Sequence, residues 1–259
     1  MSMKIAVVFY GKFTGNNIRG ELQGWEESFS YLKNNILGEN VDIFFHGWDD
    51  DEVESKKLVD TFKPKKYILE KQLDFNHPHQ SHNFVPQGPW ETKKYIYNNY
   101  SRFYSIKKAV SLVEETYDLI LLTRFDTIFY SPFPFNEMNP ENFYVTNWVH
   151  NEYGYGFNDA WFISGYKNMV NFSLIFDRLD EYYNLESDYV NFLKSKGLTL
   201  ENLPSGHVTT KYRTLEIGLE NNTYTFGEMG ITWDLIRYKD FRNSSLRVNK
   251  TFDEKICKL

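Results

Sequence analysis

Short apolar runs alternate with longer stretches of helical spacing along the chain. The short runs are rich in residues that favour β-strands, and they occur at residues 5–10, 41–45, 67–69, 119–122, 143–146 and 160–164. Between several of these runs, apolar residues recur at steps of three and four, as on the buried face of a helix. These stripes are Leu22, Trp25, Phe29, Leu32 and Ile36; Phe103, Ile106, Val110 and Val113; and Phe172, Phe176, Leu179 and Tyr183. The order predicts βαβ units, and therefore a three-layer α/β sandwich with a mainly parallel central sheet.

No feature of the sequence divides the chain into independent parts. The 259 residues contain no internal repeat and no linker rich in glycine or serine. One segment, residues 75–89, combines several histidines, prolines and glycines and interrupts the periodicity, which predicts a long exposed loop. We therefore expect a single domain over residues 1–259.

Composition and charge narrow the class of protein. Hydrophobic residues make up 41% of the chain and charged residues 25%, as in a folded globular protein. The formal net charge of -6 argues against a nucleic-acid partner, because such proteins need a basic surface to release counterions from phosphates. No apolar run approaches the roughly 20 residues of a membrane span, and the single cysteine, Cys257, cannot form an internal disulfide. We expect a cytoplasmic protein without a transmembrane segment, located in the host cytoplasm if the source is a virus.

The first candidate site follows the apolar run at residues 119–122, where Arg124-Phe125-Asp126 brings charge abruptly to a strand end. Ligands of α/β sheets bind outside the carboxyl ends of the strands. In an extended chain, Arg124 and Asp126 project to one side and Phe125 turns toward the core. Asp126 could then ligate a hard divalent cation, and Arg124 could bind a diphosphate through its guanidinium fork. The same spacing also suits a plain salt bridge or a turn cap.

Two other strand ends carry polar or aromatic candidates. His46, Trp48 and Asp49 end the second run, where Trp48 could stack on a base and Asp49 could accept a hydrogen bond from a base or ribose. Gly11 ends the first run, and a glycine there lets the backbone approach a ligand closely. The acidic residues at 50–52 are more typical of a solvated helix start.

Two carboxylates, those of Asp159 and Glu216, are candidates for contact with a substrate hydroxyl that accepts a transferred group. Asp159 precedes the apolar run at residues 160–164, so it lies at the edge of the sheet where this strand begins. There it could orient an acceptor hydroxyl or remove its proton. A strand-end cap is the alternative. Glu216 lies in a stretch of helical spacing, where it could also form an ordinary pair with Arg213, three residues before it.

Four stretches of the chain resemble a loosely defined family of GT-A-type glycosyltransferases from surface-polysaccharide gene clusters, phages and large viruses. These are residues 4–11, residues 41–49, the region from Arg102-Phe103-Tyr104-Ser105-Ile106 through Asp126, and residues 158–165. Where the family often places a His-Pro-Glu helix start, this chain has His207-Val208-Thr209. In the family, an Asp-x-Asp motif at a strand end binds Mn²⁺ or Mg²⁺ and the donor diphosphate, and Arg124-Phe125-Asp126 stands in its place here.

The resemblance implies a GT-A-like, Rossmann-like fold with a nucleotide-binding half over about residues 1–130 and an acceptor-side half over about residues 131–259. It implies a hexosyl- or pentosyltransferase of polysaccharide biosynthesis, which moves a sugar from a nucleoside-diphosphate sugar to a glycan hydroxyl. Asp126 is the expected ligand of Mn²⁺ or Mg²⁺. The expected site comprises Gly11, Trp48 and Asp49 at the nucleotide, Arg124 and Asp126 at the diphosphate, and Asp159, or alternatively Glu216, as the base if the reaction inverts configuration.

Two other functions suit the same residues. A nucleotidyl or phosphoryl transferase would use similar metal and diphosphate contacts on a similar sheet. A glycan-binding module without catalytic activity would use the aromatic residues, 18% of the chain, as stacking platforms for sugars.

Overall fold

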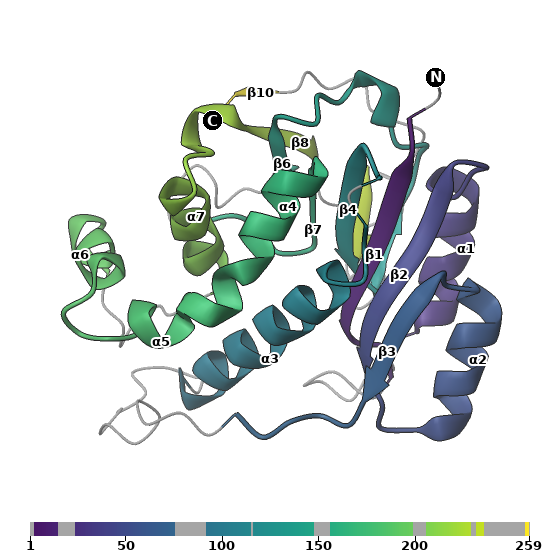
Figure 1. Ribbon diagram of the computed structural model, residues 1–259, viewed down its shortest axis with the longest axis horizontal. Coiled ribbons are helices and arrows are strands. Elements are labelled where there is room, and N and C mark those ends of the chain that lie inside the picture. The colour runs from purple at the N-terminus through teal and green to yellow at the C-terminus, as the bar shows by residue number, and fades with distance from the viewer. Residues whose placement is uncertain are drawn as a thin grey trace, which may run out of the picture.

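The computed structural model describes residues 3–14, 24–75, 92–114, 116–147, 156–198, 206–228, 232–235 and 257–258. Their main feature is an eight-stranded mixed sheet in the order β10-β8-β6-β7-β4-β1-β2-β3 (Figure 1). Its strands are β1 (Ile5–Lys12), β2 (Val41–Trp48), β3 (Lys66–Glu70), β4 (Leu119–Arg124), β6 (Phe143–Asn147), β7 (Trp161–Ser164), β8 (Thr223–Glu228) and β10 (Cys257–Lys258). A separate two-stranded sheet pairs β5 (Thr127–Phe129) with β9 (Trp233–Leu235).

Most neighbouring strands of the large sheet are parallel. The pairs β3 and β2, β2 and β1, β1 and β4, and β6 and β8 run parallel, whereas β7 is antiparallel to both β4 and β6. The reversal of β7 has a direct consequence for the site. The beginning of β7 lies at the edge where β1 and β4 end, so residues that precede β7 meet residues that follow β1 and β4.

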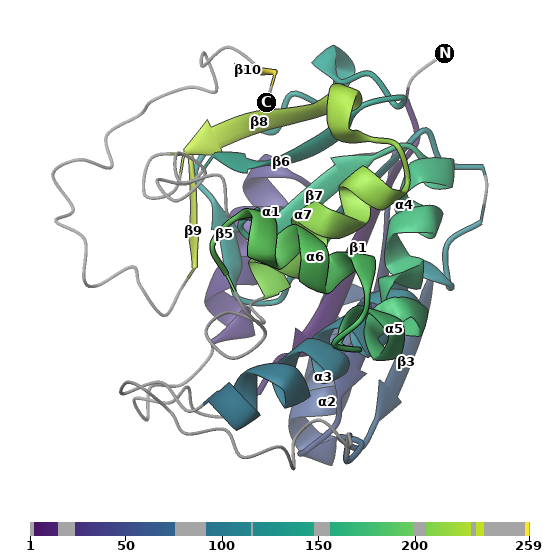
Figure 2. The ribbon, with the colours of Figure 1, turned by 90° about the vertical axis from the view of Figure 1, so that its left-hand side faces the viewer.

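Helices cover both faces of the sheet (Figures 1 and 2). On one face lie α1 (Trp25–Asn35) and α2 (Glu52–Phe62). The other face carries α3 (Thr92–Val110), α4 (Tyr166–Ser173), α5 (Leu179–Tyr182), α6 (Asp188–Ser195) and α7 (Gly206–Glu216). Three 3₁₀ turns lie at Leu174–Arg178, Phe135–Glu137 and Glu220–Asn222, and Phe135 packs on the face of α1 and α2. The expected three-layer α/β class with a mainly parallel central sheet is therefore confirmed. Within the described ranges, no helix is both long and apolar enough to cross a membrane.

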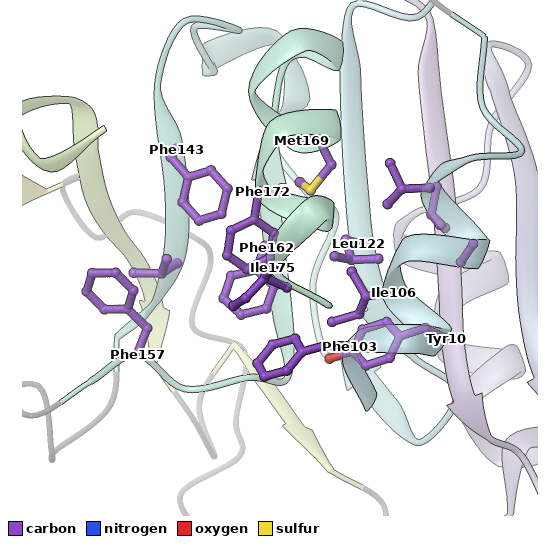
Figure 3. Packing of buried hydrophobic residues seen from close by; sticks show 14 of the residues in the cluster. Tyr10, Phe103, Ile106, Leu122, Phe143, Phe157, Phe162, Met169, Phe172 and Ile175 are labelled. Carbon is purple, nitrogen blue, oxygen red and sulfur yellow. The ribbon is translucent and has the colours of Figure 1, made fainter. Parts of the chain in front are cut away.

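The alternation of side chains along the strands divides the core into two clusters. Even-numbered residues of β1 and β4, such as Val8 and Leu122, pack with α3 and α4. Figure 3 shows this cluster, with the ring of Tyr10 directed toward Phe103 of α3. Odd-numbered residues, such as Phe9, pack with α1 and α2 on the opposite face. The strand exits inherit this alternation, which decides where each side chain of the candidate site points.

Most elements with a strong apolar pattern lie where the sequence predicts them. All six expected strands are present, and the acidic start expected at residues 50–52 opens α2, where Asp51 caps the helix by accepting from the backbone N–H groups of Val53 and Glu54 at 2.9 and 3.2 Å. The stripe from Phe172 to Tyr183 falls on α4, a 3₁₀ turn and α5 instead of one continuous helix. Apart from its first residue, the loop expected at residues 75–89 lies outside the described residues.

Candidate active site

Three strands meet at the sheet edge where β1 and β4 end and β7 begins. Tyr10 of β1 is paired with Arg124 of β4, and the Arg124 N–H donates to the carbonyl of Ala160, just before β7, at 3.4 Å. The Tyr10 hydroxyl donates to the carbonyl of Asp159 at 2.6 Å. Strand pairing therefore brings together two of the predicted site residues, Arg124 and Asp159, although they are far apart in sequence.

Arg124 and Asp126 form a bidentate ion pair on the α3 side of the sheet. Nε of Arg124 lies 2.8 Å from Oδ1 of Asp126, and Nη2 lies 2.9 Å from Oδ2. Phe125 turns to the opposite face, where its ring contacts Phe9 and Phe13, and its carbonyl accepts from the Ser28 hydroxyl of α1. Arg124 and Asp126 lie together and Phe125 faces the other way, as expected, although residues 125–126 form a turn and not an extended strand. The salt bridge that the spacing also allowed is present. Arg124 keeps 20% of its side chain exposed.

A second arginine, Arg102 of α3, reaches the same edge and forms an ion pair with Asp159. Its Nη2 also donates to Oδ1 of Asn99, one helical turn earlier, at 2.6 Å. Gly206, at the start of α7, packs directly on this guanidinium, because a side-chain carbon there would overlap it. The Arg102 side chain is therefore fixed from three directions, while 17% of it stays exposed.

The first turn of α7 closes the other side of the cluster. Nδ1 of His207 lies 2.8 Å from the carbonyl of Phe157 and 3.8 Å from Oδ1 of Asp159. The Phe157 N–H donates to the His207 carbonyl at 3.0 Å, and Gly156 packs against the same backbone, which leaves no room for a side chain. The segment before β7 is thus held on α7, and this contact places Asp159 beside the helix start.

The cluster contains opposite charges in close proximity. Burial raises the pKa of Tyr10 to about 12, although Arg124 and Arg102 act to lower it, so this hydroxyl stays protonated and donates. Burial, assisted by the nearby positive charge of Arg124, lowers the pKa of Arg102 to about 10, which still leaves the guanidinium cationic at neutral pH. Two cations and two carboxylates therefore share one edge of the sheet.

Gly11 is connected to the core by a chain of hydrogen bonds. Its N–H donates to Oγ of Ser105 at 2.7 Å, Ser105 bonds to Nδ1 of His46 at 2.7 Å, and Nε2 of His46 lies 2.8 Å from Oε1 of Glu70. Burial lowers the pKa of His46, so its ring is neutral at pH 7 and its donated proton goes to Glu70. Gly11 itself has φ +96, a conformation that favours glycine. These contacts fix the chain where β1 leaves the sheet.

Trp48 is buried against α3, whereas Asp49 lies close to the start of α2. The Trp48 side chain is only 2% exposed, and its ring stacks on Tyr104 of α3 with centroids 5.6 Å apart. One face of the indole is thus occupied by Tyr104, and the role of Trp48 at the nucleotide stays a prediction. Asp49 accepts from the Ser55 hydroxyl at 2.6 Å, close to the start of α2.

Glu216 lies at the opposite end of α7 from His207, about 14 Å along the helix at 1.5 Å per residue. Its carboxylate accepts from Arg213, as the sequence spacing allowed, and from the Tyr182 hydroxyl. Arg178 donates to it at 3.1 Å. Although burial acts to raise it, these hydrogen bonds lower the pKa of Glu216. The structure does not bring Glu216 to the cluster around Asp159.

The residues present do not fit the expected metal site. Both oxygens of Asp126 are engaged by Arg124, and Arg102 and His207 surround Asp159. In the part of the chain that the structure describes, no group of three or more His, Cys, Asp or Glu side chains is arranged to hold a metal ion. A divalent cation prefers several oxygen ligands, and this edge presents cationic guanidinium groups to each of its carboxylates.

Arg102 and Tyr10 belong to this cluster, but the sequence alone indicates no role for either of them. Arg102 lies within one of the stretches that carry the family resemblance, but its reach depends on how α3 crosses the sheet. In the sequence, Tyr10 is only the last apolar residue of a predicted strand. Its pairing with Arg124 of β4 places its hydroxyl at the edge where these strands end. The one feature of the sequence that could have indicated Arg102 is its position directly before the apolar helical stripe that begins at Phe103.

Comparisons with known proteins find similarity at the level of structure only. No protein-family model matches the chain, and no curated protein matches it in sequence. The apo form of the glycosyltransferase GlyE of Streptococcus pneumoniae TIGR4 is 15% identical, with a TM-score of 0.46 over 86% of this chain. The chain spans 45% of the length of GlyE. Apo mouse xyloside xylosyltransferase 1 is 12% identical, with a TM-score of 0.45 over 95% of this chain and 92% of its own. Similarity of this degree does not by itself place the chain in a family.

Proposed function

We propose that the protein transfers a sugar from a nucleoside-diphosphate sugar to a hydroxyl of a glycan or related acceptor. The observation that supports this most is the convergence of Arg124, Asp126 and Asp159 at the carboxyl edge of parallel strands. Ligands of open α/β sheets bind at this edge. Guanidinium groups there suit a diphosphate leaving group, and a carboxylate suits a sugar hydroxyl. The family resemblance of the same residues points to the same reaction.

In this proposal the donor diphosphate lies against Arg124. Asp126 holds the guanidinium by two hydrogen bonds, so that its orientation is fixed before the ligand arrives. Among the described residues, no atom lies within 4 Å of the position that a side-chain carbon of Gly11 would take, which lets the nucleotide approach the end of β1. Negative charge develops on the diphosphate as the bond to the sugar breaks, and Arg124 stabilises it.

Asp159 orients the acceptor hydroxyl. In an inverting reaction it accepts the hydroxyl proton as the acceptor oxygen bonds to the anomeric carbon and the nucleoside diphosphate leaves. In a retaining reaction, no such base is required, and Asp159 serves to position the acceptor. Glu216, the alternative base, is about 14 Å from His207 along α7, and this separation favours Asp159.

A thermal-shift screen tests the proposal. Uridine, guanosine and cytidine diphosphates and their sugars are each added with Mn²⁺ and with a chelator. A ligand at about 100 times its Kd stabilises the folded state by about 2.7 kcal/mol, which is a shift of several degrees for a chain of this size. Stabilisation by one nucleotide family supports donor binding. No stabilisation by any nucleotide contradicts it.

Product analysis distinguishes the competing enzyme. A glycosyltransferase incubated with its donor and acceptor releases a nucleoside diphosphate, whereas a nucleotidyltransferase releases pyrophosphate. A glycan-binding module without activity would bind glycans and none of the nucleotides. The three outcomes are mutually exclusive, so the two assays together separate these functions.

A further inference from the structure

The edge that holds the proposed donor site presents two arginines from different layers of the fold. Arg124 ends a strand of the sheet, and Arg102 comes from α3, which covers it. Tyr10 is paired with Arg124 and its hydroxyl bonds to the carbonyl of Asp159, whose carboxylate binds Arg102. This short path of contacts places both guanidinium groups around the end of β1.

Each arginine is held by one carboxylate, and both remain partly exposed. Asp126 binds Arg124 and Asp159 binds Arg102, while the two guanidinium side chains keep 20% and 17% of their surface exposed. A guanidinium carries five N–H donors, of which a bidentate carboxylate engages two. Arg124 donates to Asp126 through Nε and Nη2, and Arg102 meets Asp159 through Nη1, so each carboxylate orients an arginine that stays partly exposed.

Each guanidinium has a carboxylate partner, yet the two positive charges still repel each other across the edge. The positive charge of Arg124 contributes to the lowered pKa of Arg102, which is the electrostatic sign of this repulsion. A diphosphate, with oxygens on two linked phosphorus atoms, can accept from both forks at once. Asp126 is the residue that the sequence predicts as a metal ligand, but both of its oxygens are engaged by Arg124.

We propose that Arg102 and Arg124 together bind the donor diphosphate without a divalent cation. Their positive charge stabilises the diphosphate as it leaves. This inference rests on the proposed function. Asp126 and Asp159 are then the carboxylates that orient the two arginines. Asp159 has a second role toward the acceptor, because its other oxygen is directed to the His207 side of the cluster. The bond that breaks is the one between the anomeric carbon and the diphosphate oxygen, and its electron pair goes to the diphosphate.

Calorimetric titration with uridine, guanosine and cytidine diphosphate, in chelator and in Mn²⁺, tests this directly. In the wild-type protein, the Kd of the preferred nucleotide should change by less than about threefold between the two conditions, below the usual range of coupling between two ligands. Asp126→Asn should retain binding in chelator, since Arg124 is still present. If Asp126 held a metal, the same variant would lose the binding that the wild-type protein shows in Mn²⁺.

Substitutions of Arg102 supply the second part of the test. Arg102→Gln should weaken nucleotide binding by about 10- to 100-fold, the range for loss of hydrogen bonds to a charged group. Arg102→Lys keeps the charge but loses the fork, so it should bind with intermediate affinity, and it serves if the glutamine variant does not fold. Arg178→Gln removes a partner of Glu216 at the far end of α7. It is the matched control and should bind as the wild type does.

The outcomes separate this inference from the proposed function. Binding that needs Mn²⁺, or that is unchanged in both Arg102 variants, overturns the two-arginine site and leaves the proposed function intact. Absence of nucleotide binding in both conditions overturns the proposed function itself. Equal binding in chelator and Mn²⁺, together with weaker binding in the Arg102 variants, supports the two-arginine site.

Discussion

The two ends of α7 carry clusters of similar composition and different surroundings. At its start, His207 lies beside Asp159 and Arg102, and strands β1, β4 and β7 converge on the same point. At its end, Glu216 binds Arg178 and Arg213. Both clusters pair arginines with carboxylates, and the spacing of residues in the sequence does not distinguish them.

The difference between the clusters is one of fold position. The cluster at the start of α7 takes its residues from a sheet edge and from helices on one face, so its members come from distant parts of the chain. The cluster at the end of α7 joins helical residues, and Arg178 also pairs with Glu181 three residues away, as on an ordinary helix surface. An ion pair at a sheet edge is therefore a candidate for ligand binding, whereas one between outer helices is a candidate for stability.

The largest expected effect is that of Asp159→Asn on turnover. Loss of a residue that works directly on the acceptor proton lowers the rate by about 10²- to 10⁴-fold. Binding of the nucleoside diphosphate should be largely retained, because Arg102 and Arg124 are both still present and the asparagine oxygen can still accept from Arg102. Steady-state kinetics and calorimetry on the same preparation measure both quantities. Asp177→Asn, which removes an exposed partner of Lys107, is the matched control.

Near-normal turnover in Asp159→Asn would remove Asp159 as a base and leave a retaining reaction or another base. Loss of nucleotide binding along with turnover would instead show that Asp159 acts chiefly by orienting Arg102 for the donor. Either result would weaken the distinction between a donor-binding and an acceptor-binding part of the cluster.

A smaller effect is expected from Glu216→Gln, and it should appear in stability instead of turnover. The substitution removes a charge that accepts from three donors, and we expect the free energy of unfolding to fall by about 1–3 kcal/mol. Turnover should stay within about threefold of the wild-type value, because this carboxylate lies far from the sheet edge. Denaturant unfolding and kinetics measure the two quantities. A loss of turnover at unchanged stability would make Glu216 the base.

The smallest expected effect is on the pH dependence of stability through His46. Burial lowers the pKa of His46 below its ordinary value of 6.5, so the unfolded chain takes up this proton first as the pH falls. The free energy of unfolding should therefore be constant above about pH 6.5 and decrease below it. In His46→Asn, which does not titrate, the part of this decrease in the pH interval just below 6.5 should shrink. Equal slopes for the two proteins in this interval would show that His46 does not contribute.

The sequence predicts the strands and the orientation of the residues at their ends, because both depend on local alternation. Arg124 and Asp126 lie together and Phe125 joins the apolar cluster, as expected, although a turn at residues 125–126 brings this about and not an extended strand. The spacing of residues does not predict that Arg124 and Asp159 lie at the same edge, since this depends on β7 running antiparallel to β4. The ion pair of Arg102 and the burial of Trp48 depend likewise on how α3 packs across the sheet.

The most direct test compares one arginine from each cluster in a single nucleotide titration. The wild-type protein, Arg124→Gln and Arg178→Gln are titrated in chelator with the nucleoside diphosphate that gives the largest thermal shift. We predict that Arg124→Gln weakens binding by about 10- to 100-fold, as expected for hydrogen bonds to a charged group, and that Arg178→Gln binds as the wild type does. Equal affinities in all three proteins, at unchanged folding, would contradict a donor site at the sheet edge.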